Sequence, residues 1–443
     1  MDDSSSYAPA SNNISPKQLA AWRLGRFGYV VFLAVWIIGF FFWLVKRALL
    51  GRLLFSMTPA GFNFVDYVSF YRCGKLALFF PHLIYDRVAQ LAVYNQIIAP
   101  LHVRVDESVP YVPWMFLLEA PFALLSLPSS FVIWNIVWIG FSLVALIAFI
   151  HGLERRMPHN FVLAGSRKWL FLLAVFASWP VLHSIANGQT TLLMIGAIAL
   201  ASLYWLEQKD IACGLLLSVL SLKPHYLLYL LIPALAKRRW AVVISCLVAT
   251  AVFAGVSATA FGLKAVIGYP AYVMTLEDDP VYSSWFVCLR CPLTYIAGAH
   301  LAFKISIAVY SAAMIWIYRL WRGLAAEQTA IGLAVTVCSM LVVSPHVHFY
   351  DLGFLSVPAA LLLGGAVCDA GGDWRIKRER LGLITALVAF PIVGAFAFVI
   401  TDLLPVQSVL ALIYLPLIVW IWYCSMALLK RPVDSASGGT AGE

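Results

Sequence analysis

The chain has 443 residues, of which 62% are hydrophobic and 12% are charged. This composition is far more apolar than that of a soluble domain, and apolar runs of spanning length recur from end to end. The formal net charge is +9, but the basic residues are spread over several short loops and form no continuous basic face, which argues against a nucleic-acid partner. The sequence therefore predicts an all-α polytopic membrane protein.

The chain divides into a short polar leader, a membrane domain and a short polar tail. The corresponding residues are 1–26, 27–431 and 432–443. Both polar ends are expected to be disordered and cytoplasmic. The first apolar run is long and lacks a small-residue cleavage site, so we interpret it as a retained span and not as a signal peptide. Residues 46–129 are expected to form a long first extracytoplasmic loop that contains juxtamembrane helices.

Basic residues in the loops determine the predicted topology, because they favour the cytoplasmic side. The apolar segment 113–127 is short, carries Glu119 and is followed by Pro128, so we interpret it as a surface or re-entrant helix. Counting it as a span would place most basic clusters outside. About twelve spans result, of which the first, second, third and seventh are expected at about 27–45, 130–151, 169–185 and 241–261. Two segments, 211–222 and 225–236, are short for a full crossing, which predicts a membrane-embedded break between them.

Most of the unusual polar residues fall on the extracytoplasmic side under this topology. They are Asp66, Glu119, Asn187, Gln189, Lys223, His225, Arg290, His346, His348 and Asp351. Ionisable groups at membrane depth are costly and commonly mark a pathway or a site. Asp66 stands among aromatic residues, where a partly desolvated acid is suited to accepting a proton. The alternative is that Asp66 is a loop residue or a helix cap.

Other polar features also allow a purely structural interpretation. The segment Asn187-Gly188-Gln189 precedes a span and can act as a helix cap. Lys223 precedes Pro224 and can be an interfacial lysine whose ammonium reaches water.

The two histidines His346 and His348 lack an obvious third ligand for a metal, so hydrogen bonding to an anion or a sugar hydroxyl is favoured over metal binding. Arg290 lies in an apolar stretch, where a phosphate would satisfy its guanidinium bidentately. The flanking pair Cys288 and Cys291 is either incidental or a disulfide.

Four sequence blocks together resemble a known family. They are Asp66-Tyr67-Val68-Ser69-Phe70-Tyr71, Tyr111-Val112-Pro113-Trp114, the run from Asn187-Gly188-Gln189-Thr190 through Cys213-Gly214 and Ser221-Leu222-Lys223-Pro224 to Lys237-Arg238-Arg239-Trp240, and Val343-Ser344-Pro345-His346-Val347-His348-Phe349-Tyr350. In order and rough spacing they resemble glycosyltransferase family 87, polytopic enzymes of the GT-C superfamily. Two departures are Val112, where the family usually has proline, and His346-Val347-His348, which lacks the family's tryptophan.

The resemblance implies a bacterial cytoplasmic-membrane enzyme with a GT-C-like bundle and an extracytoplasmic active site. Such an enzyme transfers a hexose, typically mannose, from a polyprenyl-phosphate sugar donor to a lipid, glycan or protein acceptor, with inversion. Two functions of other classes stay open. One is a transporter or flippase of lipid-linked sugars, and the other is a non-catalytic subunit of an envelope-assembly complex.

The resemblance also implies roles for individual residues. Asp66 is expected to be the catalytic base. Candidates for binding the donor phosphate are Lys223, Arg290, His346 and His348, and candidates for binding substrate are Tyr67, Tyr71, Gln189, Tyr111 and Glu119. Because a positive clamp can stabilise a phosphate leaving group, neither a metal nor a cofactor is expected.

Overall fold

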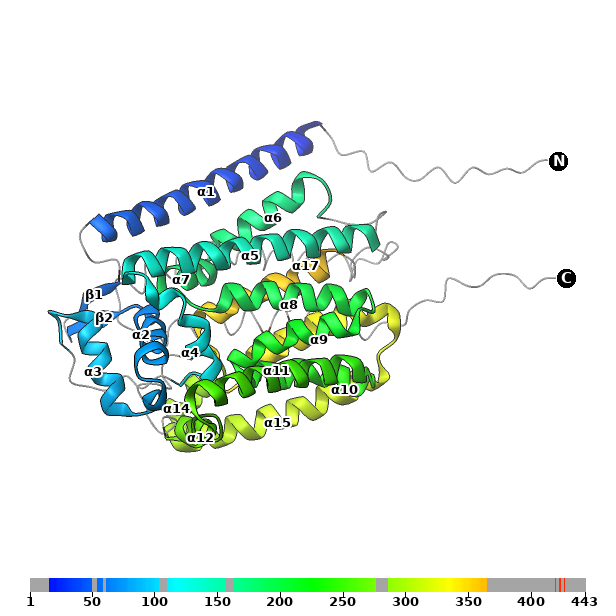
Figure 1. The fold of residues 1–443 in the computed structure, drawn as a ribbon. Coiled ribbons are helices and arrows are strands. Elements are labelled where there is room, and N and C mark those ends of the chain that lie inside the picture. The colour runs from blue at the N-terminus through cyan, green and yellow to red at the C-terminus, as the bar shows by residue number, and fades with distance from the viewer. Residues whose placement is uncertain are drawn as a thin grey trace, which may run out of the picture.

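The computed structural model describes residues 16–49, 54–58, 61–102, 110–156, 163–275 and 286–364, together with 419, 422, 423 and 426. Helices dominate these ranges (Figure 1). The two strands described, β1 (Phe55–Thr58) and β2 (Gly61–Phe64), form an antiparallel hairpin. The hairpin leads directly into the helix that carries Asp66.

The helices follow one another along the whole described chain. They are α1 (Pro16–Leu49), α2 (Asp66–Phe79), α3 (Arg87–Ile98), α4 (Pro113–Glu119), α5 (Leu127–Arg156), α6 (Ser166–Ala177), α7 (Trp179–Asn187), α8 (Thr191–Leu206), α9 (Asp210–Ser218), α10 (Pro224–Ala236), α11 (Trp240–Phe261), α12 (Leu263–Met274), α14 (Arg290–Ala297), α15 (Ala299–Gly323), α16 (Thr329–Val343) and α17 (Ser356–Gly364). Five short 3-10 helices are η1 (Pro81–Leu83), η2 (Phe122–Leu124), η3 (Val219–Leu222), η4 (Ala326–Gln328) and η5 (Phe349–Leu355). Because α1 begins at Pro16, it includes residues 16–26 of the predicted leader.

Five helical segments in the described ranges are long and apolar enough to cross a membrane. They are Phe27–Leu49, Leu127–Arg156, Trp240–Phe261, Ala299–Gly323 and Ala326–Val343. The pair α6 and α7 would be a sixth, broken span, since the two helices meet at 54°. The predicted helical membrane fold is thus confirmed. The total of twelve spans stays a prediction, because the last two predicted spans fall almost entirely outside the described residues.

The structure describes both the short apolar segment 113–127 and the predicted break between segments 211–222 and 225–236. In the segment 113–127, α4 has seven residues and is therefore about 10 Å long. The chain between residues 210 and 236 is divided into α9, η3 and α10, with Lys223 at the end of η3 and Pro224 as the first residue of α10. Proline is favoured at that position because the first helical N–H has no intrahelical partner.

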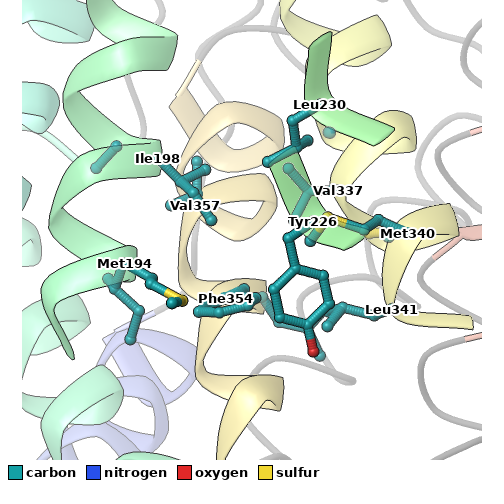
Figure 2. Close-up of a cluster of buried hydrophobic side chains, with 14 of the residues drawn as sticks. Met194, Ile198, Tyr226, Leu230, Val337, Met340, Leu341, Phe354 and Val357 are labelled. Carbon is teal, nitrogen blue, oxygen red and sulfur yellow. The ribbon is translucent and has the colours of Figure 1, made fainter. Parts of the chain in front are cut away.

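The core lies between α8, α10, α16 and the η5–α17 segment. Figure 2 shows Met194 of α8 pointing towards Phe354 and Ile198 of α8 beside Val357, with Tyr226 and Leu230 of α10 on the other side of the cluster. Helix α8 is apolar around almost its whole circumference, as expected of a helix enclosed by others. Tyr226 contributes its ring to this apolar cluster, while its hydroxyl points away from Leu230 (Figure 2).

The bundle has two different ends (Figure 1). The hairpin, α2, α3 and α4 lie at one end. The α8–α9 and α10–α11 connections and the C-terminal end of α5 lie at the other. Basic residues belong to this second end, namely Arg155 and Arg156 in the last turn of α5 and residues 237–239 between α10 and α11.

Candidate functional site

The carboxylate of Asp66 lies at the N-terminus of α2, where it is partly buried. Its Oδ2 accepts a hydrogen bond of 2.5 Å from Nε2 of Gln189, whose side chain is almost completely buried. The helix N-terminus and the amide both place positive partial charge beside the carboxylate. Val65, and not Asp66, is the N-cap residue of α2. The structure therefore favours the interpretation that Asp66 belongs to a functional site over the interpretation that it is a helix cap.

Two tyrosines hold α2 against the start of α5. The hydroxyl of Tyr67 is 2.6 Å from Oγ of Ser130, and the hydroxyl of Tyr71 donates to the carbonyl of Leu125 at 2.7 Å. The Tyr67 ring also packs against Trp134, with 5.8 Å between ring centroids. Burial raises the pKa of Tyr67, so its hydroxyl stays protonated. These contacts fix the helix whose first residue is Asp66.

Gly188 brings the α7–α8 connection into contact with α2. Its φ of +64° is in the left-handed region that favours glycine, and it ends α7 as the C-cap. A Cβ added there would lie 2.7 Å from Cβ of Tyr67. The indole N–H of Trp134 donates to the Gly188 carbonyl at 2.7 Å. Gly188 thus caps the end of the preceding helix, and Gln189 reaches Asp66. The N-cap of the following helix α8 is Thr190, which lies outside the predicted capping segment.

A second polar group surrounds the fully buried carboxylate of Asp351 in η5. Lys223 Nζ donates to Oδ1 at 2.6 Å, and Tyr226 OH donates to Oδ2 at 2.8 Å. Thr191 Oγ1 donates to Oδ1 at 3.2 Å, and the backbone N–H of His348 donates to Oδ2 at 3.1 Å. Lys223 is therefore anchored inside the protein, which argues against a simple interfacial lysine.

The two predicted histidines lie beside this ion pair. His348 stacks on Tyr350, with 5.1 Å between ring centroids and 14° between planes. His346 lies 5.5 Å from the ring of His225. Burial, followed by the positive charge of Lys223, holds the pKa of His348 well below its usual range. His348 is therefore a neutral imidazole that can offer one N–H donor.

Arg290 is completely buried at the start of α14. Its guanidinium carbon lies 5.1 Å from the ring centroid of Phe286 and 4.8 Å from that of Phe303. Phe286 also contacts the rings of both His346 and His348, with 5.0 Å between centroids in each case. The predicted phosphate-binding residues Lys223, His346, His348 and Arg290 thus belong to one contiguous group.

The cysteines beside Arg290 are free thiols. Cys288 and Cys291 are both buried, which favours the interpretation that the pair is incidental. Within the described ranges, no group of three or more His, Cys, Asp and Glu side chains could hold a metal ion.

Glu119 and Tyr111 lie beside α2 on its buried side. Glu119 is completely buried, and in the described part of the chain neither of its carboxyl oxygens has a hydrogen-bond partner. Burial raises the pKa of Glu119 well above its usual range. The ring of Tyr111 packs on Phe70 of α2 at 4.7 Å between centroids. Their predicted role in substrate binding stays a prediction.

A single short connection links the two polar groups. Gln189 contacts Asp66, and Thr191, two residues further along, contacts Asp351. Two residues span at most about 7 Å, so the backbone positions of Gln189 and Thr191, which contact the two groups, lie close together. From the sequence, Asp351 is one of the converging polar residues, but no pattern indicates a role for it. Its position beside an apolar run does indicate that Asp351 needs a positively charged partner, because an unpaired buried carboxylate is costly.

Comparison with known proteins shows the family to which the chain belongs. Residues 110–345, more than half of the chain, match glycosyltransferase family 87. No curated protein and no solved structure matches the chain. The apolar helical fold and the family match together define a membrane glycosyltransferase. The chain belongs to glycosyltransferase family 87. The matched residues include Gln189, Lys223 and Arg290, whereas Asp66 precedes them and His346 follows them directly.

Proposed function

We propose that this protein transfers a hexose, in particular mannose, from a polyprenyl-phosphate donor to a lipid, glycan or protein acceptor, with inversion. The observation that carries the proposal is that one short connection, from Gln189 to Thr191, contacts two groups of opposite chemistry. Gln189 holds the carboxylate of Asp66, and Thr191 contacts Asp351, which binds the ammonium of Lys223. Transfer from a sugar phosphate needs one group of each kind.

Asp66 is the proposed base. It takes the proton of the acceptor hydroxyl as that oxygen attacks the anomeric carbon, and the bond from this carbon to the phosphate oxygen breaks on the opposite face. The electron pair of the broken bond stays on the polyprenyl phosphate. Because Asp66 is partly exposed at the start of α2, an acceptor can approach its carboxylate.

Lys223 and the two histidines are the proposed partners of the leaving phosphate. An ammonium has three N–H donors, and within the described residues Lys223 uses one of them, towards Asp351. His346 and His348 can add N–H donors from the same group. The leaving group is already an anion, so fixed positive charge helps it more than a proton would. Arg290, behind Phe286, adds positive charge without direct contact.

The site is proposed to face the outside of a bacterial cytoplasmic membrane. The hairpin and α2 lie at the end of the bundle opposite the basic residues of α5 and the α10–α11 connection (Figure 1). Basic residues favour the cytoplasmic side, which supports an extracytoplasmic position for Asp66.

The proposal is tested with purified protein, polyprenyl-phosphate mannose and a membrane lipid extract, followed by mass analysis of the product. We expect the wild type to transfer the sugar and Asp66→Asn to lose about 10²- to 10⁴-fold in rate while inserting normally. Near-normal transfer by Asp66→Asn would show that the base is another residue. In a second assay, with protein in lipid vesicles, movement of the donor across the membrane without sugar transfer would support the transporter. Inactivity in both the transfer assay and the vesicle assay would support the non-catalytic subunit.

A further inference from the structure

The carboxylate of Asp351 is saturated with hydrogen bonds. Each of its oxygens accepts two, from Lys223 and Thr191 on one side and from Tyr226 and the backbone of His348 on the other. The side chain has no exposed surface. A carboxylate with this environment is poorly placed to exchange a proton with substrate, so its contribution must come through its partners.

Lys223 is the partner of Asp351 whose side chain is still partly exposed and can bind a further group. Its side chain keeps 14% of its surface exposed, whereas that of Asp351 keeps none. The ammonium lies 4.9 Å from the ring centroid of Tyr350 and 5.7 Å from that of Tyr226, so aromatic faces and the carboxylate together hold it in place. Asp351 and the two rings therefore fix the position of the ammonium, while the exposed part of the Lys223 side chain stays accessible.

A partly buried ammonium is stabilised in its charged form by a counter-charge, because desolvation favours the neutral amine. Among the described residues, the titratable side chains around Lys223 are Asp351 of η5, His225 and Tyr226 of α10, His346 and His348 of the 344–348 connection, Tyr350 of η5 and, next to Tyr350, His183 of α7. Asp351 is the only carboxylate in this set. The histidines and tyrosines carry no negative charge near neutral pH.

We propose that Asp351 is a positioning residue that keeps Lys223 charged and in place for the donor phosphate. Asp351 also binds the backbone N–H of His348, so one carboxylate holds two of the phosphate-binding candidates at a fixed separation. The effect on transfer rests on the proposed function. The effect on the charge of Lys223 does not, and it can be measured separately.

The first test labels lysines of the full-length purified protein with acetic anhydride at pH 8, because only a neutral amine reacts. Mass spectrometry compares Lys223 with the exposed Lys264 in the same sample. We expect Asp351→Asn to label Lys223 at least fivefold faster than the wild type does. A smaller increase overturns the proposal.

Tyr226→Phe is the matched control for local loosening. It removes one hydrogen bond to Asp351 but keeps the negative charge. We expect the labelling rate of Lys223 in this variant to stay within twofold of the wild type. If Tyr226→Phe accelerates labelling as much as Asp351→Asn does, exposure and not charge explains the result, and the proposal fails.

Asp351→Asn can also fail to fold, since it leaves a buried ammonium without its partner. The double variant Lys223→Met with Asp351→Asn removes both charges, and we expect it to fold and elute as the wild type does. A double variant that also fails to fold would show that Asp351 acts mainly through its other partners, which overturns the proposal.

Transfer from polyprenyl-phosphate mannose gives the functional test. We expect Asp351→Asn to lower kcat/KM at least tenfold, and the double variant to match Lys223→Met within threefold, because Asp351 acts through Lys223. A kcat/KM of the double variant more than threefold below that of Lys223→Met would overturn the proposal. If the wild type transfers no sugar, the proposed function fails, while the labelling result still decides the role of Asp351.

Discussion

The side-chain amide of Gln189 donates a hydrogen bond of 2.5 Å to the carboxylate of Asp66, across 123 positions of sequence. The bond joins the start of α2 to the connection between α7 and α8. Asp66 is the proposed base, and Gln189 is almost completely buried, so the amide sets the orientation of the carboxylate. The pair attaches the proposed base to the connection whose Thr191 contacts Asp351.

Replacing Gln189 should therefore impair transfer more than stability. Gln189→Leu keeps the approximate volume but removes the donor to Asp66. A hydrogen bond to a charged group contributes about 1.5–3 kcal/mol, so we expect kcat to fall about tenfold to a hundredfold. The measurement is transfer kinetics with purified protein. Gln96→Leu, at an exposed position of α3, is the control and should leave kcat unchanged. Equal kcat for Gln189→Leu and the wild type would contradict the inferred role.

Gly188→Ala should destabilise the contact between the α7–α8 connection and α2. The left-handed backbone there costs a non-glycine residue about 1–2 kcal/mol, and the new Cβ would lie 2.7 Å from Cβ of Tyr67. Overpacking of this kind adds about 1–3 kcal/mol. We expect a lower apparent melting temperature in detergent, together with reduced transfer because Tyr67 adjoins Asp66.

The matched control is Gly140→Ala in the middle of α5. A Cβ at Gly140 meets no atom within 4 Å. Alanine is favoured over glycine in a helix by about 1 kcal/mol, so this variant should be as stable as the wild type or more stable. Equal melting temperatures for Gly188→Ala and Gly140→Ala would refute the predicted clash.

Glu119→Gln should change how stability depends on pH. Burial raises the pKa of Glu119 in the folded protein, so between the unfolded and folded pKa values the folded state binds more protons. The stability contributed by the protonated form is complete below the unfolded pKa and is lost as pH rises towards the folded one. Glutamine is neutral at every pH. We therefore expect the apparent melting temperature to fall less between pH 5 and pH 8 in Glu119→Gln than in the wild type.

Glu327→Gln, at an exposed position of η4, is the control for this pH series and should keep the wild-type slope. Parallel pH curves for Glu119→Gln and the wild type would show that the buried carboxyl does not bind the proton in the folded protein.

Much of the helical framework could be predicted from the sequence because apolar runs are local. The predicted spans at 27–45, 130–151 and 241–261 coincide with α1, α5 and α11. The break at Lys223-Pro224 was also predicted, from the proline and the two short segments. The span predicted at 169–185 differs, because the structure divides it into α6 and α7 with a bend of 54°. Pro180, in the first turn of α7, was the signal for that bend.

By itself the sequence determined the membrane character, the main helices and the polar residues that do not suit an apolar bundle. Asp66, Gln189 and Lys223 could be selected in this way. Their partners could not, because Gln189 contacts Asp66 across 123 positions and Lys223 contacts Asp351 across 128. Helix periodicity is set by neighbours in the chain, whereas the pairing of buried charges depends on how the helices pack. Only the tertiary structure decided that one connection, from Gln189 to Thr191, contacts both Asp66 and the carboxylate that binds Lys223.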